Sequence, residues 1–252
     1  MSLKDKNVVV TGGSRGLGLG LVEALVDHGA RVTVVARQSD ALEAVGTRLG
    51  VSTIAADIRD EAAAHRILAD VRPDILALNA GSKPPMGRLD QMSWTDFTAP
   101  WEHDVKAGLH WLQAALNLPL NPGSRVLVVS SGAAVNGSPM SGGYGGAKRM
   151  LWFMASYANR VSEQRQLGIR FQTIIPRQMV LGTGIGDAAA SAYAQAMGVE
   201  PEAFVARFGA PMSPRRFGEN VVAILDDPMH AEGFAFGLSG DNGVTMMERL
   251  AD

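Results

Sequence analysis

The stretch NVVVTGGSRGLG, residues 7–18, places a short apolar run directly before a turn rich in glycine. Residues 7–11 have the length and composition of a buried strand, and the residues from the turn to His28 have the apolar spacing of a helix. Glycines between a strand and a helix let the backbone approach a pyrophosphate, whose charge is favoured at the helix N-terminus. The stretch therefore predicts a strand–turn–helix unit that binds a dinucleotide.

The same turn also satisfies the nucleophile-elbow pattern of hydrolases, with Gly12, Ser14 and Gly16 as its defining positions. Ser14 follows the first strand of the chain, however, and no segment that could form an oxyanion hole is evident. A hydrolase is therefore a minor alternative, which ester cleavage abolished by Ser14→Ala would favour.

Short apolar runs and longer helical runs alternate along the rest of the chain. Further strands are expected at 31–36, 53–56, 75–79, 125–130, 170–175 and 234–238, and further helices at 40–49, 60–71, 97–117 and 144–166. This alternation predicts an α/β fold: a doubly wound, mostly parallel Rossmann-type sheet of about seven strands with helices on both faces. No repeat, linker or low-complexity tract divides the chain, so a single domain over 1–252 is expected.

Polar and chemically active residues gather at the ends of these strands. Ligands of such sheets bind beyond the carboxyl ends of the strands. The residues at or just after those ends are Thr11, Ala36, Asp57, Asn79, Ser131 and Pro176. The sequence therefore predicts one site, assembled at one edge of the sheet from distant parts of the chain.

A hydroxyl, a phenol and an ammonium follow the fifth expected strand, as Ser131, Tyr144 and Lys148. Tyr144 and Lys148 lie about one helical turn apart and can share a face. A free tyrosine titrates near pH ~10, and lowering that pKa by about three units requires about 4 kcal/mol. One ammonium at about 4 Å supplies roughly that much at an effective dielectric of about 20. The trio suits proton exchange with a carbonyl or alcohol oxygen, which Ser131 would orient.

Together these motifs resemble the short-chain dehydrogenase/reductase family. The matching pieces are Thr11-Gly12-x-x-x-Gly16-x-Gly18, Asp57-Ile58, Asn79-Ala80-Gly81, Ser131 and Tyr144-x-x-x-Lys148, in the family's order and at its separations over nearly the whole chain. The resemblance implies that Tyr144 is the acid/base, that Lys148 lowers its pKa and holds the ribose, and that Ser131 polarises the substrate oxygen.

The resemblance also implies a site for a nicotinamide dinucleotide. Its residues here would be Gly12, Ser14, Arg15, Gly16, Leu17, Gly18, Arg37, Asp57, Ile58, Asn79, Ala80, Gly81, Tyr144, Lys148, Pro176 and Thr183. Asp57 would contact the adenine, and Asn79-Ala80-Gly81 would pack beneath it.

The end of the second strand bears on the choice between the two nicotinamide cofactors, because the adenosine ribose sits there. The strand ends in Val35-Ala36-Arg37, with no acid to bind a free 2′-hydroxyl. Arg15 and Arg37 could instead make charge-assisted contacts with a 2′-phosphate, which favours NADP(H) over NAD(H). The alternative is that Arg37 is an ordinary solvated loop charge.

The chain departs from the family pattern at three positions. Asp104 stands where the family has an asparagine whose main-chain carbonyl holds a water linked to the lysine, and Arg177 replaces the glycine after Pro176. If the Asp104 carboxylate faces Lys148, it weakens the effect of the lysine on the tyrosine; the alternative is that Asp104 points elsewhere. The threonine expected near the nicotinamide appears only at Thr183, so its role is in question.

Two further expectations concern the substrate and the assembly. Residues 187–214 would form the family's mobile lid, and seven methionines and aromatics in expected loops suggest an apolar pocket: Trp94, Met140, Met179, Met197, Phe204, Phe208 and Met212. Aromatic side chains on two helices favour a homodimer or homotetramer over ordinary helix–sheet packing alone: Trp101, Trp111, Trp152, Phe153 and Tyr157.

The overall composition limits the classes of partner that the protein is expected to bind. The chain has 252 residues, 23 basic and 25 acidic, which gives no field that favours nucleic acid or an anionic membrane. It has no cysteine, no histidine pair at metal-ligand spacing and no apolar stretch near the roughly 20 residues that cross a bilayer, and because Lys4, Asp5 and Lys6 lead straight into a strand we expect no signal peptide. We therefore expect a cytoplasmic protein without a metal, whose partner is a small molecule.

These observations predict an NADP(H)-dependent oxidoreductase of a carbonyl/alcohol pair, with a fairly apolar ketone or secondary alcohol as substrate. The alternative is a nicotinamide-dinucleotide-binding sensor with little or no turnover, which Asp104 and Arg177 keep open. Consumption of NADPH with a ketone panel, lost in Tyr144→Phe, would separate the two.

Overall fold

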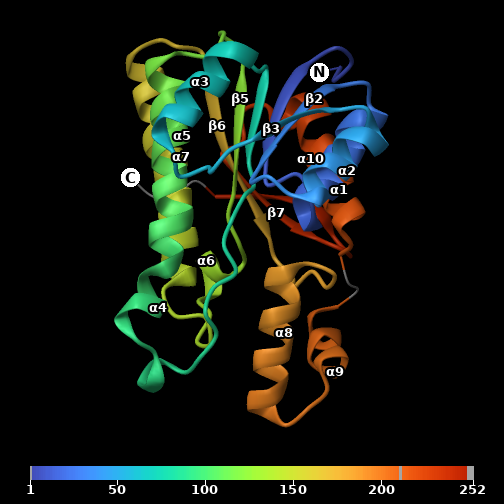
Figure 1. Ribbon diagram of the computed structural model, residues 1–252, viewed down its shortest axis with the longest axis vertical. Helices are drawn as coiled ribbons and strands as arrows, with labels where there is room; N and C mark the ends of the chain where they lie inside the picture. The colour runs from blue at the N-terminus through green and yellow to red at the C-terminus, as the bar shows by residue number, and fades with distance from the viewer. Residues whose placement is uncertain (1, 210–211, 249–252) are drawn as a thin grey trace.

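One twisted sheet contains all eight strands of the described residues, 2–209 and 212–248 of the computed structural model (Figure 1). The strand order is β3-β2-β1-β4-β5-β6-β7-β8. The strands are β1 Asn7–Thr11, β2 Arg31–Ala36, β3 Ser52–Ala55, β4 Ile75–Leu78, β5 Arg125–Val129, β6 Arg170–Pro176, β7 Ala235–Ser239 and β8 Gly243–Met247. The order reverses between β1 and β4, and a ligand crevice is expected where neighbouring crossovers leave in opposite directions.

The sheet has one strand more than the sequence predicted. β1 to β7 pair in parallel, whereas β8 pairs antiparallel with β7 through a tight turn that joins Ser239 to Gly243. β8 is an edge strand whose residues are half-buried or exposed. It therefore lacks the continuous apolar run that marks the buried parallel strands.

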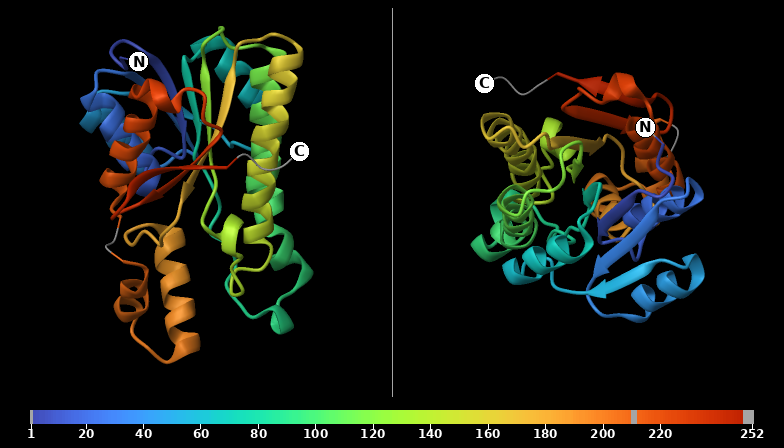
Figure 2. Two further views of the ribbon diagram at one scale, coloured as in Figure 1. Left: turned by 180° about the vertical axis from the view of Figure 1, so that it is seen from behind. Right: turned by 90° about the horizontal axis from the view of Figure 1, so that it is seen from above.

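Helices cover both faces of the sheet (Figure 2). One face carries α1 Gly16–Asp27, α2 Asp40–Leu49 and α10 Pro214–Asp226; the other carries α3 Glu61–Val71, α5 Lys106–Asn117 and α7 Tyr144–Gln164. Each group of helices packs its apolar side into its own large core cluster. The predicted doubly wound α/β fold is confirmed.

The helix expected over 97–117 is interrupted. The structure has α4 Trp94–Pro100, then a π-helical turn Trp101–Val105, then α5. Pro100 has no N–H to donate into the helical ladder, and a wider turn accommodates this loss. Asp104, within the π-turn, is buried.

Beyond the carboxyl ends of the strands lie three helices that the sequence did not predict: α6 Ala133–Asn136, α8 Gly184–Met197 and α9 Pro201–Val205 (Figure 1). α8 and α9 occupy most of the expected lid, apart from residues 210–211, which lie outside the described residues. The apolar side chains that the sequence assigned to loops have mixed positions: Phe204 and Met212, in the expected lid, are buried, while Trp94, which begins α4, is 76% exposed. They do not form one pocket lining, because helix packing within the α8–α9 unit uses some of them.

Within the described residues, no helix is long and apolar enough to span a membrane. The same residues contain no group of three or more His, Asp or Glu side chains placed to hold a metal ion.

Candidate active site

The glycine turn lies between β1 and α1, as the sequence predicted. Gly12 and Gly16 have φ angles of +68° and +55°, in the left-handed region that side chains with a Cβ rarely adopt. A Cβ on Gly18 would lie 2.2 Å from the carbonyl oxygen of Gly12, so the turn closes tightly onto the helix. Arg15 precedes α1 and makes no side-chain capping bond to it. The first backbone N–H groups of α1 therefore remain available to an anion, and this cradle fits a pyrophosphate.

Residues at the end of β4 brace the turn. The hydroxyl of Thr11 accepts hydrogen bonds from the backbone N–H groups of Asn79 and Ala80, both at 3.1 Å, and the Asn79 side chain donates to the carbonyls of Thr11 and Gly12 at 3.2 and 3.3 Å. The sequence placed Asn79 and Ala80 beneath the adenine and Thr11 at the strand end where the site forms, but it assigned Thr11 no contact. The structure assigns the Thr11 hydroxyl to the brace between the two segments.

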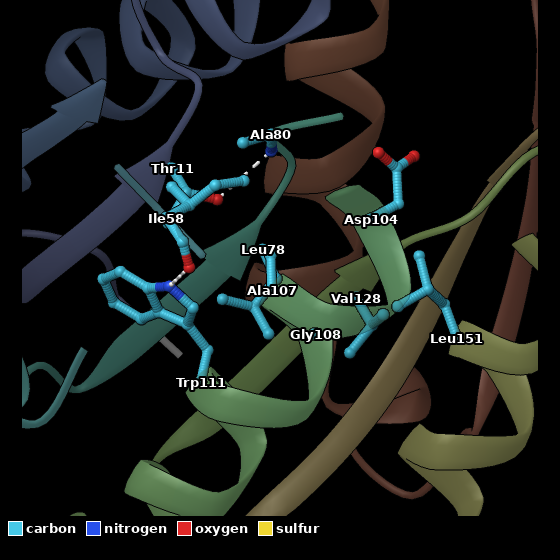
Figure 3. A pocket seen from close by; sticks show the side chains of 10 residues that line it. All are labelled: Thr11, Ile58, Leu78, Ala80, Asp104, Ala107, Gly108, Trp111, Val128 and Leu151. Atoms are coloured by element: carbon cyan, nitrogen blue, oxygen red, sulfur yellow. Dashed lines mark hydrogen bonds between the residues drawn. The ribbon is translucent and has the colours of Figure 1, made fainter. Parts of the chain in front are cut away.

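The arginines expected near the adenosine lie at the carboxyl edge of the sheet. Arg15 and Arg37 are both exposed, one at the start of α1 and one just after β2. Asp57, expected to contact adenine, is paired with Arg59, whose Nη2 lies 2.6 Å from Asp57 Oδ2. Hydrogen bonds from Arg59 lower the pKa of Asp57 to about 2, so its carboxylate is ionised at neutral pH. Ile58 follows it and accepts a hydrogen bond from the Trp111 indole at 3.0 Å through its carbonyl (Figure 3).

The structure brings Ser131, Tyr144 and Lys148 together. Tyr144 begins α7, and Lys148 lies one turn later with Nζ 5.6 Å from the centre of the Tyr144 ring. The Ser131 hydroxyl accepts a hydrogen bond from the backbone N–H of Ala133 at 3.2 Å, and the Ser131 side chain lies near enough to the Tyr144 phenol to lower its pKa. The hydroxyl of Ser130 donates to the carbonyl of Lys148 at 2.7 Å and thereby fastens the end of β5 to α7. The predicted trio is therefore assembled around one point.

Asp104 faces Lys148, which settles the two alternatives that the sequence left open. Asp104 Oδ2 lies 3.0 Å from Lys148 Nζ, and the side chains are 0% and 4% exposed. The other carboxylate oxygen accepts hydrogen bonds from the Ser82 backbone N–H at 2.8 Å and from its hydroxyl at 3.0 Å. A Cβ on Gly81 would lie 3.1 Å from Asp104 Oδ2 and 3.2 Å from Lys148 Nζ, so glycine leaves room for the pair. Ser82 was missed by the sequence analysis, although it directly follows the Asn-Ala-Gly motif.

A small cavity of about 20 Å³ lies between α5, β4 and β5, and Asp104 is among the residues that line it. Figure 3 shows the Asp104 carboxylate turned away from the apolar side chains of Leu78 and Ala107. This volume holds about one water molecule, so the cavity is too small for a substrate.

Burial reverses the expected pKa of the tyrosine. Burial raises the pKa of Tyr144; the Lys148 charge and the nearby Ser131 side chain lower it, while the Asp104 charge raises it further. The net pKa lies above the usual value, opposite to the lowering expected from the sequence. The Asp104 carboxylate also raises the pKa of Lys148 against the effect of burial, so the lysine stays protonated. Asp104 thus keeps Lys148 charged while offsetting part of its action on Tyr144.

The segment after β6 contains two departures from the family pattern, Arg177 and Thr183, and the structure shows what each residue contacts. The carbonyl of Pro176 accepts a hydrogen bond from Gly132 at 2.7 Å, which places the end of β6 beside the Ser131 segment. Arg177 donates its backbone N–H to the carbonyl of Leu238 at 2.8 Å, so the residue in place of glycine extends the pairing with β7. Thr183 caps α8: its hydroxyl donates to the carbonyl of Val180 at 2.7 Å and accepts from the Gly186 N–H at 3.0 Å. Its side chain lies against Gly16, and its hydroxyl is used in the cap.

Comparisons with known proteins place this arrangement in a family. Residues 6–194 match the family profile described as short chain dehydrogenase. The chain is 33% identical over 152 residues to short chain dehydrogenase/reductase AacuD of Aspergillus aculeatus, covering 57% of this chain and 54% of that protein. It is 39% identical over 90 residues to a rhamnolipids biosynthesis 3-oxoacyl-[acyl-carrier-protein] reductase of Pseudomonas aeruginosa, covering 32% of this chain and 35% of that protein. The chain thus spans about half or less of the length of these two relatives.

Two longer matches are more distant in sequence. The 3-oxoacyl-[acyl-carrier-protein] reductase FabG of Salmonella typhimurium is 25% identical over 187 residues, covering 70% of this chain and 74% of that protein. A crystal structure of a short-chain dehydrogenase from Streptomyces avermitilis superposes with a TM-score of 0.74 at 21% identity, covering 94% of this chain and 89% of the other, and supports the fold. With the family profile spanning most of the chain, the protein belongs to the short-chain dehydrogenase family of oxidoreductases, which use a nicotinamide dinucleotide.

Proposed function

We propose that this protein is an NADP(H)-dependent reductase or dehydrogenase that interconverts a carbonyl compound and its alcohol. The observation that carries the proposal is the continuity of the site. Ala80 packs so closely on the glycine turn that a Cβ on Gly12 would lie 2.7 Å from Ala80 Cα, and a Cβ on the next residue, Gly81, would lie 3.2 Å from Lys148 Nζ. The dinucleotide cradle and the Ser131–Tyr144–Lys148 trio therefore belong to one connected surface.

The bound nicotinamide would supply or accept the hydride. Tyr144 would donate a proton to the carbonyl oxygen during reduction and take it back from the alcohol during oxidation. Ser131, whose side chain lies near enough to the phenol to lower its pKa, would hold the substrate oxygen beside it. Lys148 would stabilise the phenolate as it forms, because its ammonium lies 5.6 Å from the centre of the ring.

The preference for NADP(H) is supported by Arg15 and Arg37, both exposed at the edge where the adenosine would lie. The second strand ends without an acidic residue to bind a free 2′-hydroxyl. Titration with NADPH and NADH, followed by cofactor fluorescence, tests this preference. We expect Arg37→Ala to weaken NADPH binding about tenfold or more and NADH binding little. Equal losses for both cofactors would refute the 2′-phosphate contact.

A fairly apolar ketone or secondary alcohol is the proposed substrate. Half-buried Met140, in the segment between Ser131 and Tyr144, and half-buried Met179, packed against the α8–α9 unit three residues after Pro176, support apolar contacts to the substrate. Relatives named as 3-oxoacyl-[acyl-carrier-protein] reductases support a ketone group. A panel of ketones assayed by NADPH consumption tests the proposal. Turnover should be lost in Tyr144→Phe and retained in Tyr157→Phe, an exposed tyrosine on the same helix.

A second candidate function is a nicotinamide-dinucleotide sensor with little or no turnover. The buried Asp104–Lys148 pair favours it, because the lysine charge is already offset and the pKa of Tyr144 is raised. NADPH binding without consumption across the ketone panel would support the sensor. Consumption that depends on Tyr144 would exclude it.

We also propose that the chain is a single domain, that residues 187–214 act as a lid, and that the protein assembles in the cytoplasm as a homodimer or homotetramer. Trp111 and Trp152 are buried within the chain and need no partner, but Trp101 and Tyr157 are 39% and 49% exposed. Light scattering on the purified protein tests the assembly. A dimer that Trp101→Glu dissociates would support it, whereas a monomer at high concentration would contradict it.

A further inference from the structure

We propose that Tyr193 is a positioning residue: its hydroxyl holds the turn at residues 138–140, between Ser131 and Tyr144, and joins that turn to α8. The inference rests on the proposed function, because it assigns a task in shaping the substrate side of the same site.

The contacts of the phenol cross between two separate parts of the fold. The Tyr193 hydroxyl lies 2.9 Å from the Ser138 hydroxyl and accepts a hydrogen bond from the backbone N–H of Met140 at 3.3 Å. Tyr193 belongs to α8, whereas Ser138 and Met140 precede α7 by a few residues. One side chain therefore satisfies both a hydroxyl and a backbone N–H of the turn.

The ring of Tyr193 is held in place by its own unit. It stacks on Phe204 of α9 with the ring centres 5.4 Å apart and the planes within 2° of parallel. Phe204 is 6% exposed and belongs to the buried cluster of the α8–α9 unit. Such stacked pairs resist reorientation of the ring. The position of the hydroxyl is therefore set by packing within the α8–α9 unit.

The other side of the same turn is fixed by Gly87. The backbone N–H of Gly87 donates to the carbonyl of Met140 at 2.9 Å, and Gly87 forms an isolated bridge with Ser141. The carbonyl of Ser141 then accepts a hydrogen bond from the backbone N–H of Tyr144 at 3.1 Å. The turn is thus held from two sides immediately before the residue that would exchange the proton, and Tyr193 supplies one of the two sides.

The same helix also begins at the cofactor side of the site. Thr183, the N-cap of α8, lies against Gly16 of the glycine turn. One end of α8 therefore contacts the dinucleotide cradle, and Tyr193, farther along the helix, contacts the segment that carries Ser131 and Tyr144. A helix attached at both places fixes the spacing between them, and loss of the Tyr193 hydroxyl would release only the substrate end.

Tyr193→Phe tests the inference, because it removes the hydroxyl and keeps the stacking on Phe204. Backbone hydrogen exchange of the cofactor-free protein is measured first. We expect the amide of Met140 to exchange about fivefold faster, the loss of one ordinary hydrogen bond, with Tyr157→Phe unchanged. Ser138→Ala should give part of the same increase, and the double variant should add little to Tyr193→Phe, because both changes remove the same contact.

Kinetics provide the second readout. In Tyr193→Phe we expect KM for the carbonyl compound to rise and kcat to fall, together by about fivefold in kcat/KM, with NADPH affinity within about twofold of the parent. Unchanged exchange at Met140 in a folded variant would overturn the positioning role, whether or not the protein turns over. If the Met140 amide exchanges faster in Tyr193→Phe but the parent protein shows no turnover, the role of Tyr193 in shaping the turn stands and the proposed function is refuted.

Discussion

Replacement of Asp104 by asparagine would remove a buried negative charge and keep the shape of the side chain. The remaining amide oxygen can still accept the hydrogen bonds from Ser82, now at 2.8 and 3.0 Å. The change therefore isolates the effect of the charge on Lys148 and, through the same site, on Tyr144.

The size of the effect follows from two distances. Lys148 Nζ lies 3.0 Å from Asp104 Oδ2 and 5.6 Å from the centre of the Tyr144 ring, so the carboxylate oxygen is at most about 8.6 Å, their sum, from that centre. At this distance two unit negative charges repel by about 2 kcal/mol at an effective dielectric of about 20. One pKa unit corresponds to about 1.4 kcal/mol. We therefore expect Asp104→Asn to lower the pKa of Tyr144 by about one unit.

The direction is tested by the pH dependence of kcat/KM for carbonyl reduction, which requires the protonated phenol. Activity falls as pH rises through the pKa of Tyr144, so a lower pKa moves the basic limb to lower pH by about one unit. Asp90→Asn, at an exposed carboxylate paired with Arg88, serves as the matched control and should leave the limb in place. A basic limb that stays fixed in Asp104→Asn, or moves to higher pH because Lys148 has lost its proton, would refute the reasoning.

Three further predictions concern stability. Lys148→Met leaves the Asp104 carboxylate buried without its cation and should lower the free energy of unfolding by about 3 to 5 kcal/mol. The double variant with Asp104→Asn should recover part of that loss. Urea denaturation of both variants checks this prediction, and additive losses would contradict the pairing. Thr11→Val removes the acceptor of two backbone N–H groups and should lower the free energy of unfolding by about 2 to 4 kcal/mol in the same assay. An unchanged midpoint of urea denaturation would mean that these hydrogen bonds do not stabilise the protein. Because the folded pKa values of Tyr144 and Lys148 are both raised, the stability linked to them is complete below about pH 10 and is lost as pH rises further. Thermal melts from pH 9 to 11 should show a decline in Tm that is smaller in Tyr144→Phe than in the parent. An equal decline in both proteins would contradict the linkage.

Local patterns in the sequence determined the scaffold and the identity of the candidate site. The parallel strands are continuous apolar runs, so the strand at 7–11 and the one at 31–36 were predicted at the bounds that the structure has. The glycine turn and the one-turn spacing of Tyr144 and Lys148 are properties of neighbouring residues, which backbone geometry alone makes informative. Edge strand β8 and the helices α6, α8 and α9 beyond the sheet escaped prediction, because half-exposed segments carry weak apolar patterns.

Tertiary structure alone decided how the charges and hydroxyls of the site act on one another. The Asp104–Lys148 pair joins a π-helical turn to α7, and its energetic weight comes from complete burial, which no spacing in the sequence encodes. The net pKa of Tyr144 is likewise a balance between burial and charges on other elements, so reasoning from Lys148 alone predicted the wrong sign. The contact of Tyr193 with Ser138 joins residues 55 positions apart. Electrostatic and hydrogen-bond energies depend on distance and dielectric in space, and these are fixed only when the sheet brings its strand ends together.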